Sequence, residues 1–328
     1  MSLARFRGPG HPDALCDLMA ASLVEAYLER DPEARTRICV TGGRESVFVD
    51  GDLVSNADFD AAPVLRRVIA EVDPVLSFES FLTCDAVQTE FLPVAASADP
   101  CIVNGYATAE TSDYWPLARH AGRVFTQAIE FVRLKEEEGF ILGSDYDIIM
   151  DDVRREATVR MEVATEAHLS SVERLLLELL DGALQGWKLR MVGKGVIGPS
   201  GLRRRSGASG RTSSVDQGSS HLPSSVSGVG YVVRHPGNLG AWLARAEARR
   251  LVREGKGRGV LLVLRWDAYE TRPQLVSARN ERGEDLAGSV ALATLDLMLP
   301  HSSYAKPEYL TKQLKAEWDK SIALPWEG

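Results

Sequence analysis

The stretch Gly8-Pro9-Gly10-His11-Pro12-Asp13-Ala14-Leu15-Cys16-Asp17 is the part of this chain around which the rest is organised. Pro12 suits the first position of a helix, because its missing N–H has no helical partner there. Asp13 follows in the first turn, where the positive end of the helix dipole favours a carboxylate. The stretch therefore predicts a glycine turn and then a helix, whose N-terminus carries an imidazole and a carboxylate together.

Apolar residues continue this helix on one face until Asp31-Pro32, where we expect it to end: Leu15, Leu18, Met19, Leu23 and Tyr27. Taken alone, the motif has two interpretations. His11 and Asp13 form either a chemical site at the start of the helix, or an ordinary helix start with a capping carboxylate and a surface histidine.

Composition restricts the class of protein. The chain has 328 residues, 45% of them hydrophobic and 26% charged, which is typical of a globular protein with two or three small domains or one composite core. A net charge of -8 argues against a general nucleic-acid binder. No apolar run is long enough for a bilayer span and residues 1–7 lack a signal-peptide core, so we expect no membrane association and a cytoplasmic location.

The cysteines are scattered along the chain without CxxC spacing, at Cys16, Cys39, Cys84 and Cys101. This spacing indicates neither a zinc site nor a disulfide framework. We expect them to be small buried apolar residues.

Helices are predicted where apolar residues recur at helical spacing, and strands where β-prone runs lie between turn residues. The predicted helices span 12–30, 61–72, 117–135, 170–184, 240–254 and 292–298. The predicted strands span 36–40, 46–49, 80–83, 91–94, 148–152, 158–164, 259–264 and 273–276. Strands and helix recur in a similar order, which predicts an α/β (α+β) protein of three similar subdomains, with mixed or antiparallel sheets covered by helices. We place these subdomains at 1–97, 98–197 and 198–328.

Residues 198–230 are rich in Gly, Ser and Arg. Such a composition is typical of a flexible linker. It is equally consistent with a polyphosphate cradle, since glycine lets the backbone approach an anion and guanidinium groups bind its oxygens in pairs. No GxxxxGK[ST] motif is present, so the region is not a P-loop.

Four segments in order resemble the S-adenosylmethionine synthetases (methionine adenosyltransferases). Residues 10–55 begin with GHPD and are similar to the family's opening helix and hairpin. ADPCIVNGYATAET (98–111) resembles the family's GDQGLMFGYATNET, and SGASGRTSSVD (206–216) resembles CGLTGRKIIVD. The end of the chain, from LDLMLPHSSY (295–304) to LPWE (324–327), is similar to the family's closing segment.

The resemblance implies three α/β subdomains around a pseudo-threefold axis, and a homodimer or tetramer with active sites between subunits. It implies that the methionine sulfur attacks C5′ of ATP and displaces tripolyphosphate, which is then hydrolysed, with Mg²⁺ and K⁺ assisting. The substrates would be ATP and a small amino-acid-like molecule.

Carried over residue by residue, the family pattern implies a role for each matching position. His11 would donate a hydrogen bond to the departing triphosphate, and Arg211 would bind phosphate. Asp13 would ligate Mg²⁺. The remaining matches are Asp52 and Asp99, which would face the amino acid, and Asp145, which would hold the ribose.

Several positions depart from the family pattern. A lysine is replaced at Ala14, Asp147, Thr212 and His235, an acidic residue is replaced at Arg204 or Arg205, and a metal-binding aspartate is replaced at Gly237. Cys39 stands at the potassium-binding glutamate, which puts potassium binding in doubt. Arginines 203–205 and Lys194 gather near the same loop, so they could restore phosphate binding with fewer Mg²⁺ ions. His235 is a further candidate donor to phosphate.

Two functions follow. The first is a divergent synthetase-like enzyme that binds ATP and transfers adenosyl to a sulfur nucleophile, methionine or an analogue. The alternative is a catalytically impaired homologue that acts as a regulatory or scaffold partner of an active synthetase, because loss of one charge-stabilising group typically costs orders of magnitude in rate. A contact of the arginine loop with RNA is a weaker third possibility, which the acidic net charge opposes.

Overall fold

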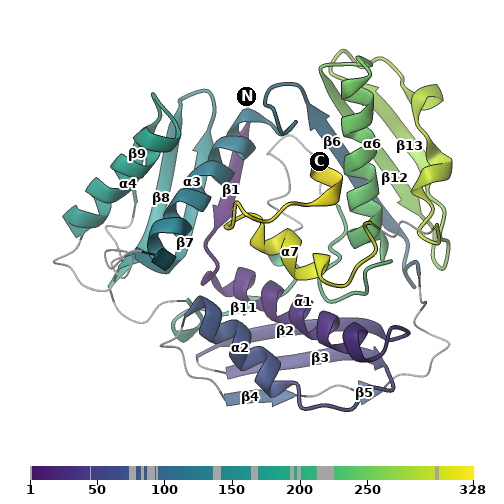
Figure 1. Cartoon of the computed structure of the whole chain (residues 1–328), viewed down its shortest axis with the longest axis horizontal. Coiled ribbons are helices and arrows are strands. Elements are labelled where there is room, and N and C mark those ends of the chain that lie inside the picture. The colour runs from purple at the N-terminus through teal and green to yellow at the C-terminus, as the bar shows by residue number, and fades with distance from the viewer. Residues whose placement is uncertain are drawn as a thin grey trace.

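The fold comes from a computed structural model, which describes residues 2–44, 46–73, 79–82, 85–86, 93, 95–135, 142–163, 169–192, 196–197, 201–212, 225–299 and 303–328. Three sheets, each with helices on one face, surround a C-terminal segment in the middle of the molecule (Figure 1). The predicted α+β architecture of three helix-covered sheets is confirmed.

The first sheet has the strand order β11-β2-β3-β4, with β5 also paired to β3. Its strands are β2 (Arg35–Gly43), β3 (Ser46–Val54), β4 (Glu79–Leu82), β5 (Asp85–Ala86) and β11 (Gly207–Ala208). β2 is antiparallel to β3 and to β11, whereas β4 and β5 run parallel to β3. Helices α1 (Pro12–Arg30) and α2 (Ala62–Val72) cover this sheet (Figure 1).

The second sheet has the order β1-β7-β8-β10, with β9 also paired to β8. Its strands are β1 (Leu3–Arg7), β7 (Leu142–Asp151), β8 (Glu156–Val163), β9 (Lys188–Met191) and β10 (Val196–Ile197). It is covered by α3 (Leu117–Lys135) and α4 (Leu169–Ala183). The third sheet is antiparallel in the order β13-β12-β6, built from β6 (Cys101–Thr108), β12 (Gly259–Trp266) and β13 (Gln274–Asn280), and α6 (Ala241–Arg253) covers it.

Strand pairing crosses the three sequence ranges in which the subdomains are expected. β1 lies beside β7, β6 lies beside β12, and β11 lies beside β2. Each sheet therefore takes strands from more than one of the ranges 1–97, 98–197 and 198–328. Most strands of the first, second and third sheet come from the first, second and third range in turn.

Helix α1 is buried on nearly all sides, because it contacts its own sheet, α2 and the C-terminal helix α7 (Tyr309–Lys315). A helix in such a position needs apolar or small residues around its whole circumference. Its burial makes α1 the central element of the largest hydrophobic core, which also includes Trp242 of α6 and Trp326 near the C-terminus.

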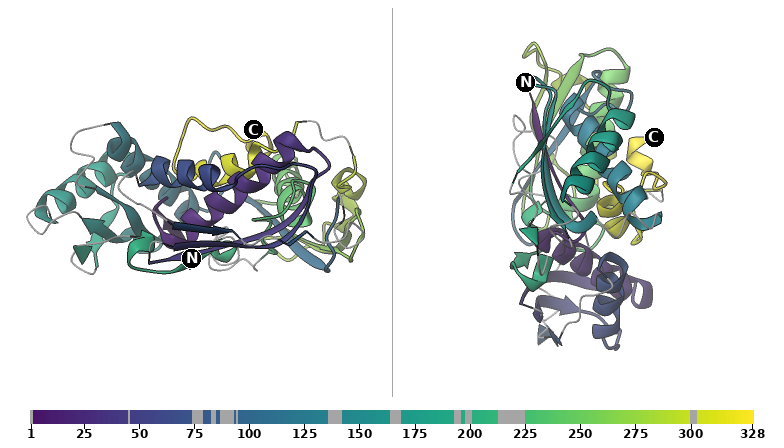
Figure 2. Two further views of the ribbon diagram at one scale, coloured as in Figure 1. Left: turned by 90° about the horizontal axis from the view of Figure 1, so that it is seen from below. Right: turned by 90° about the vertical axis from the view of Figure 1, so that its left-hand side faces the viewer.

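The opposite faces of the sheets are open. Along β2 the buried residues alternate with exposed ones, and the exposed set is Arg37, Cys39 and Thr41. Figure 2 shows the helices and the C-terminal segment on one side of the sheets. The open faces carry large apolar side chains that are about half exposed: Phe48 50%, Ile102 53%, Ile149 43% and Val276 58%.

The C-terminal segment is held by buried polar contacts. Arg245 on α6 donates to both carboxylate oxygens of Glu327, at 3.0 and 2.9 Å, and to the carbonyl of Tyr106 at 2.6 Å. Trp242 and Trp326 stack with their ring centroids 4.3 Å apart. These contacts join the last residues of the chain to the third sheet.

Most predicted elements are present, with two corrections. The segment 292–298 is not a regular helix: it holds one short 3₁₀ turn, Leu292–Leu295, because the backbone of Leu297 bonds to Thr271 and Arg234 instead of to its own segment. Cys39 is exposed, because it points to the open face of β2, whereas Cys16 and Cys101 are buried as expected. Cys84 and the strand expected at 91–94 lie outside the described residues. Among the described helices, none is long and apolar enough to cross a membrane.

We predict that Arg245→Met lowers the free energy of unfolding by about 3–5 kcal/mol, since it leaves the buried Glu327 carboxylate without its partner. The urea midpoint of the purified variant measures the change. The matched control is Arg265→Met, whose ion pair with Asp267 is exposed and should contribute less than about 1 kcal/mol. Equal losses in the two variants would contradict this account of the C-terminal segment.

A second prediction concerns Asp17 on α1, which accepts hydrogen bonds from the Gly210 N–H and the Thr212 hydroxyl. Burial raises the pKa of Asp17 from 3.8 to about 7. Between these values the folded state binds more protons than the unfolded state, so ionised Asp17 costs more stability as the pH rises. Asp17→Asn cannot ionise, so its melting temperature relative to wild type should increase from about pH 5 to about pH 8. A pH-independent difference between the two proteins would be inconsistent with a buried, titrating carboxyl group.

Candidate functional site

The turn before α1 is held tightly against β7. The N–H groups of Gly8 and Gly10 donate to the carbonyls of Tyr146 and Ser144, at 2.8 and 2.9 Å. A Cβ atom at Gly10 would lie only 2.1 Å from Ser144 Oγ, so no larger residue fits here. The turn therefore places His11 at one fixed position beside the second sheet.

His11 caps helix α1 with its side chain. Its Nδ1 accepts the N–H of Asp13 at 3.2 Å, which leaves the proton of the neutral ring on Nε2. Nε2 lies 3.8 Å from Asp147 Oδ1. Burial lowers the pKa of His11 to about 4, although Asp147 and Asp145 oppose the shift. The imidazole is only 5% exposed, which excludes a surface histidine, and near neutral pH it is an uncharged N–H donor.

Asp13 binds β11 and the loop that follows it. Its Oδ1 accepts the N–H of Ala208 at 3.1 Å and lies 3.8 Å from Arg211 Nη1. Gly207 is required for this approach, because a Cβ there would lie 2.3 Å from the carbonyl carbon of Pro12. The structure thus brings Arg211 to the helix start that carries His11 and Asp13. Arg211 and His11 are 200 residues apart in the sequence.

Asp145 lies in a dense network of charges on the hairpin β7–β8. It is completely buried and accepts hydrogen bonds from Arg160 at 2.8 Å, from the Gly201 N–H at 3.0 Å and from Arg205. The neighbouring Asp147 accepts from Arg5 at 2.7 Å and from Arg160 at 2.9 Å. Both carboxylates are therefore occupied by arginines, and Asp145 has no exposed surface for a sugar hydroxyl.

Glu162 completes this network, with Arg160 Nη1 at 3.5 Å. Burial raises the pKa of Glu162 to about 7, and the charge of Asp145 adds to the shift. The sequence analysis missed Arg5, Arg160 and Glu162. The sequence pattern that could have found Arg160 and Glu162 is the alternation of charged residues along two facing strands. Asp145 and Asp147 on β7 and Arg160 and Glu162 on β8 lie on one face of the hairpin, and Asp147 pairs directly with Arg160.

A cavity of about 600 Å³ lies beside this network, and we call it the arginine cavity. Guanidinium groups and glycine backbone line it: Arg44, Arg204, Arg205 and Arg211, with Gly42, Gly43 and Gly207. Arg204 and Arg211 are exposed, whereas Arg205 turns inward to Asp145 and Arg203 turns to Asp73 at 3.2 Å. The arginine-rich loop is therefore folded over a cavity, and the described part of it (201–212) is not a free linker.

The other predicted site residues form a second group around Arg37 on β2. Asp52 pairs with Arg37 across β2 and β3, and Asp99 Oδ2 lies 3.8 Å from Arg37 Nη2. His235 stacks on Tyr231 with ring centroids 4.0 Å apart, and Tyr231 bridges to Arg37. Four residues of strand, about 13 Å, separate Arg37 from Thr41 at the arginine cavity. Lys194 lies outside the described residues.

His235 repeats the geometry of His11. It precedes Pro236, its Nδ1 accepts the N–H of Gly237 at 3.1 Å, and it is only 2% exposed. Burial lowers the pKa of His235 to about 3, and the charge of Arg37 adds to the shift. Its ring is therefore neutral, and it is enclosed by Tyr231 rather than directed into the arginine cavity.

The described residues contain no group of three or more His, Cys, Asp or Glu side chains that could share a metal ion. Asp13 contacts two residues that line the arginine cavity, Ala208 and Arg211, and one of its oxygens is taken by Ala208. One such carboxylate fits a Mg²⁺ ion whose other ligands are substrate phosphates and waters, and it does not fit an all-protein metal site.

Comparisons with known proteins agree with this geometry. Residues 6–90 match the family model described as "S-adenosylmethionine synthetase, N-terminal domain". The chain is 25% identical to S-adenosylmethionine synthase 1 of Rhodospirillum rubrum over 307 residues, covering 82% of this chain and 78% of that protein. It is 31% identical to the S-adenosylmethionine synthase of Aquifex aeolicus over 122 residues, or 33% of this chain and 32% of that protein.

The fold has a solved counterpart. The structure described as an unusual S-adenosylmethionine synthetase from Campylobacter jejuni superposes with a TM-score of 0.78 and 15% sequence identity, covering 99% of this chain and 96% of that one. The likeness at this identity concerns the fold. The family-model match at the N-terminus, the similarity over most of the chain and the shared fold identify this protein as a divergent member of the S-adenosylmethionine synthetase superfamily.

Proposed function

We propose that this protein is an ATP-binding transferase that moves the adenosyl group of ATP to the sulfur of methionine or of an analogue. The observation that carries the proposal is the arginine cavity, which lies against the N-terminus of α1 with its neutral His11 and with Asp13. Four guanidinium groups and several glycines line it, and these are the groups that bind a polyphosphate through paired hydrogen bonds.

The reaction produces a positive sulfonium group and a more negative leaving group. The residues around the arginine cavity can stabilise the negative charge. The sulfur lone pair forms a bond to C5′, the C5′–O bond breaks, and its electron pair passes to the tripolyphosphate, which is hydrolysed to pyrophosphate and phosphate. Arg44, Arg204 and Arg211 supply positive charge where the leaving group becomes negative. His11 donates a hydrogen bond from Nε2–H to the same oxygens. Its ring is uncharged and already carries the proton on Nε2, so it does not have to be protonated before it can donate.

The group around Arg37 supports an amino-acid substrate. An α-amino acid carries a carboxylate and an ammonium group, and Arg37 lies beside two carboxylates, Asp52 and Asp99. Arg37 would bind the first charge and the two aspartates the second. The strand distance of about 13 Å to the arginine cavity leaves room for the nucleoside between the amino acid and the phosphates.

Mg²⁺ would be held by Asp13 together with the phosphates, and it would withdraw charge from the leaving group. The arginines take over part of this task in our proposal, so we expect fewer metal ions than the family pattern implies. K⁺ is not part of the proposal, because Cys39 occupies the position of the family's potassium ligand.

One observation favours the alternative of an impaired homologue with a regulatory or scaffold role. Asp145, which the family pattern assigns to the ribose, is fully buried and bonded to two arginines and a backbone N–H. A protein that kept only its fold and interfaces would bind ATP weakly and would co-purify with an active synthetase.

We also propose that the open sheet faces form a homodimer interface, with the active sites beside it. The faces carry half-exposed apolar side chains on all three sheets, and Phe48 borders the arginine cavity as well. Exposed apolar patches of this kind mark protein interfaces.

The assay that tests the activity incubates the protein with ATP, Mg²⁺ and methionine and detects S-adenosylmethionine and phosphate by mass spectrometry. We expect Arg211→Met to lower kcat/KM by about tenfold to a hundredfold, since a charge-assisted hydrogen bond to phosphate is lost. The matched control is Arg154→Met, which removes a highly exposed arginine on the β7–β8 turn and should leave kcat/KM unchanged.

If the wild type forms no product, ATP-dependent melting separates the alternatives. A rise in melting temperature with ATP that Arg211→Met abolishes supports the nucleotide site and indicates a different nucleophile. Absence of product and of any ATP-dependent rise contradicts the enzyme and favours the regulatory homologue.

The dimer is tested by sedimentation velocity. Ile102→Glu places a charge on the open face, so we expect it to shift the protein from dimer to monomer. Leu177→Glu changes a similarly exposed leucine (45%) on helix α4, on the helix-covered side, and should leave the dimer intact. A wild type that is monomeric, or a dimer that Ile102→Glu does not weaken, is incompatible with this interface.

A further inference from the structure

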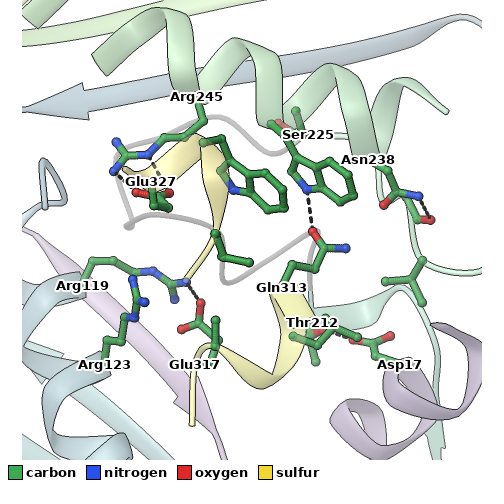
Figure 3. A pocket seen from close by; sticks show the side chains of 18 of the residues that line it. Asp17, Arg119, Arg123, Thr212, Ser225, Asn238, Arg245, Gln313, Glu317 and Glu327 are labelled. Carbon is green, nitrogen blue, oxygen red and sulfur yellow. Dashed lines mark hydrogen bonds and ion pairs between the residues drawn. The ribbon is translucent and has the colours of Figure 1, made fainter. Parts of the chain in front are cut away.

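A second cavity, of about 240 Å³, lies in the middle of the molecule and is separate from the arginine cavity. Its walls come from β1, the first turns of α1, helices α3 and α6, and the C-terminal segment from Gln313 to Glu327 (Figures 1 and 3). The two cavities share none of their lining residues. We call this one the central cavity.

One side of the central cavity is cationic. Arg119 and Arg123 lie one turn apart on α3 and point to the same side (Figure 3). Arg119 donates to Glu317, but its buried Nε has no hydrogen-bond partner. Within the part of the chain that the structure describes, no carboxylate pairs with Arg123. Arg123 therefore has donors available for a ligand, and Arg119 places a second guanidinium group beside it.

The other side is aromatic. Trp242 and Trp326 stack there, and the Trp242 indole N–H is satisfied by Gln313 at 2.7 Å. Trp115 lies under Arg245, with the guanidinium carbon 3.8 Å from the ring centroid. With its indole N–H already bonded, the ring of Trp242 presents apolar surface to the cavity, and the Trp326 ring stacks on it.

The carboxyl groups in the wall of the central cavity do not neutralise all of its arginines. Among the described residues, five arginines and three carboxyl groups line the cavity, and one of these arginines, Arg5, is paired with Asp147 outside the lining. Glu327 is bonded to Arg245, Glu317 is bonded to Arg119, and Asp17 has its pKa raised to about 7 by burial. An excess of positive charge beside an apolar wall is a costly arrangement unless an anion balances it.

We propose that the central cavity is a binding site for a small organic anion, which places a carboxylate, sulfonate or phosphate group on Arg119 and Arg123 and a planar apolar body against the tryptophans. The site is distinct from the nucleotide site and does not depend on the proposed reaction. It has the general composition of ligand pockets, mostly apolar with a few convergent polar groups.

The probe is naphthalene sulfonate, and the matched control ligand is naphthalene sulfonamide, which has the same ring and no charge. Isothermal titration of the full-length protein should show one sulfonate bound per chain, at least about tenfold more tightly than the sulfonamide, since a charge-assisted hydrogen bond is gained. Equal affinities, or no binding of either ligand, would overturn the proposal.

Three variants locate the binding. Arg123→Met should remove the preference for the sulfonate and leave sulfonamide binding unchanged. Ala241→Phe, which fills the cavity from the start of α6, should abolish binding of both ligands. Arg174→Met, which changes a 76% exposed side chain on α4, should change neither. Circular dichroism and melting temperature establish that each variant is folded, and Arg123→Gln replaces Arg123→Met if the latter is not. Sulfonate binding that survives both Arg123→Met and Ala241→Phe lies elsewhere and refutes the site.

Discussion

The structure depends on the attachment of β11 and the loop after it to the N-terminus of α1. Asp13 accepts the Ala208 N–H, and Asp17, one turn further on, accepts the Gly210 N–H and the Thr212 hydroxyl. Gly207 permits the contact because no side chain fits between the two segments. This attachment gives β11 its place beside β2 and holds Arg211 near Asp13, so the same few hydrogen bonds organise both the first sheet and the candidate site.

The balance of charge around this loop explains how the site differs from its family pattern. Where that pattern has a lysine, this chain has Asp147, and where it has an acidic residue, this chain has Arg204 or Arg205. Asp147 and Arg205 belong to one network with Asp145, Arg160 and Arg5. Asp145 and Asp147 accept the hydrogen bonds of these three arginines, which are therefore directed away from the arginine cavity or into its wall. Arg204 and Arg211 remain exposed at the arginine cavity, so the positive charge for a polyphosphate comes from a different set of side chains on the same fold.

The C-terminal segment also joins distant parts of the chain, on the side of the sheets that the helices cover. It passes between α1, α3 and α6 (Figure 1), and its contacts with Arg245 and Trp242 on α6, with Arg119 on α3 and with helix α1 connect the three helix-covered sheets. Residues of β1 and β6, of helices α1, α3 and α6 and of this segment surround the central cavity. Its cationic and aromatic sides thus belong to different parts of the chain, which only the assembled fold brings together.

The sequence by itself determined helices α1, α2, α3, α4 and α6, the β7–β8 hairpin and the likeness to a known family, because helical and strand periodicity and the GHPD turn are local properties. It also determined that His11 and Asp13 stand at a helix start. Tertiary structure decided what those residues can do: burial against the second sheet makes His11 a neutral donor, and a loop nearly 200 residues away occupies one oxygen of Asp13. It also decided that Asp145 is enclosed by arginines, and that β1, β6 and β11 join sheets distant in sequence. Which strands pair, and which charged side chains meet, depends on how the three sheets assemble, so local sequence patterns do not predict these contacts.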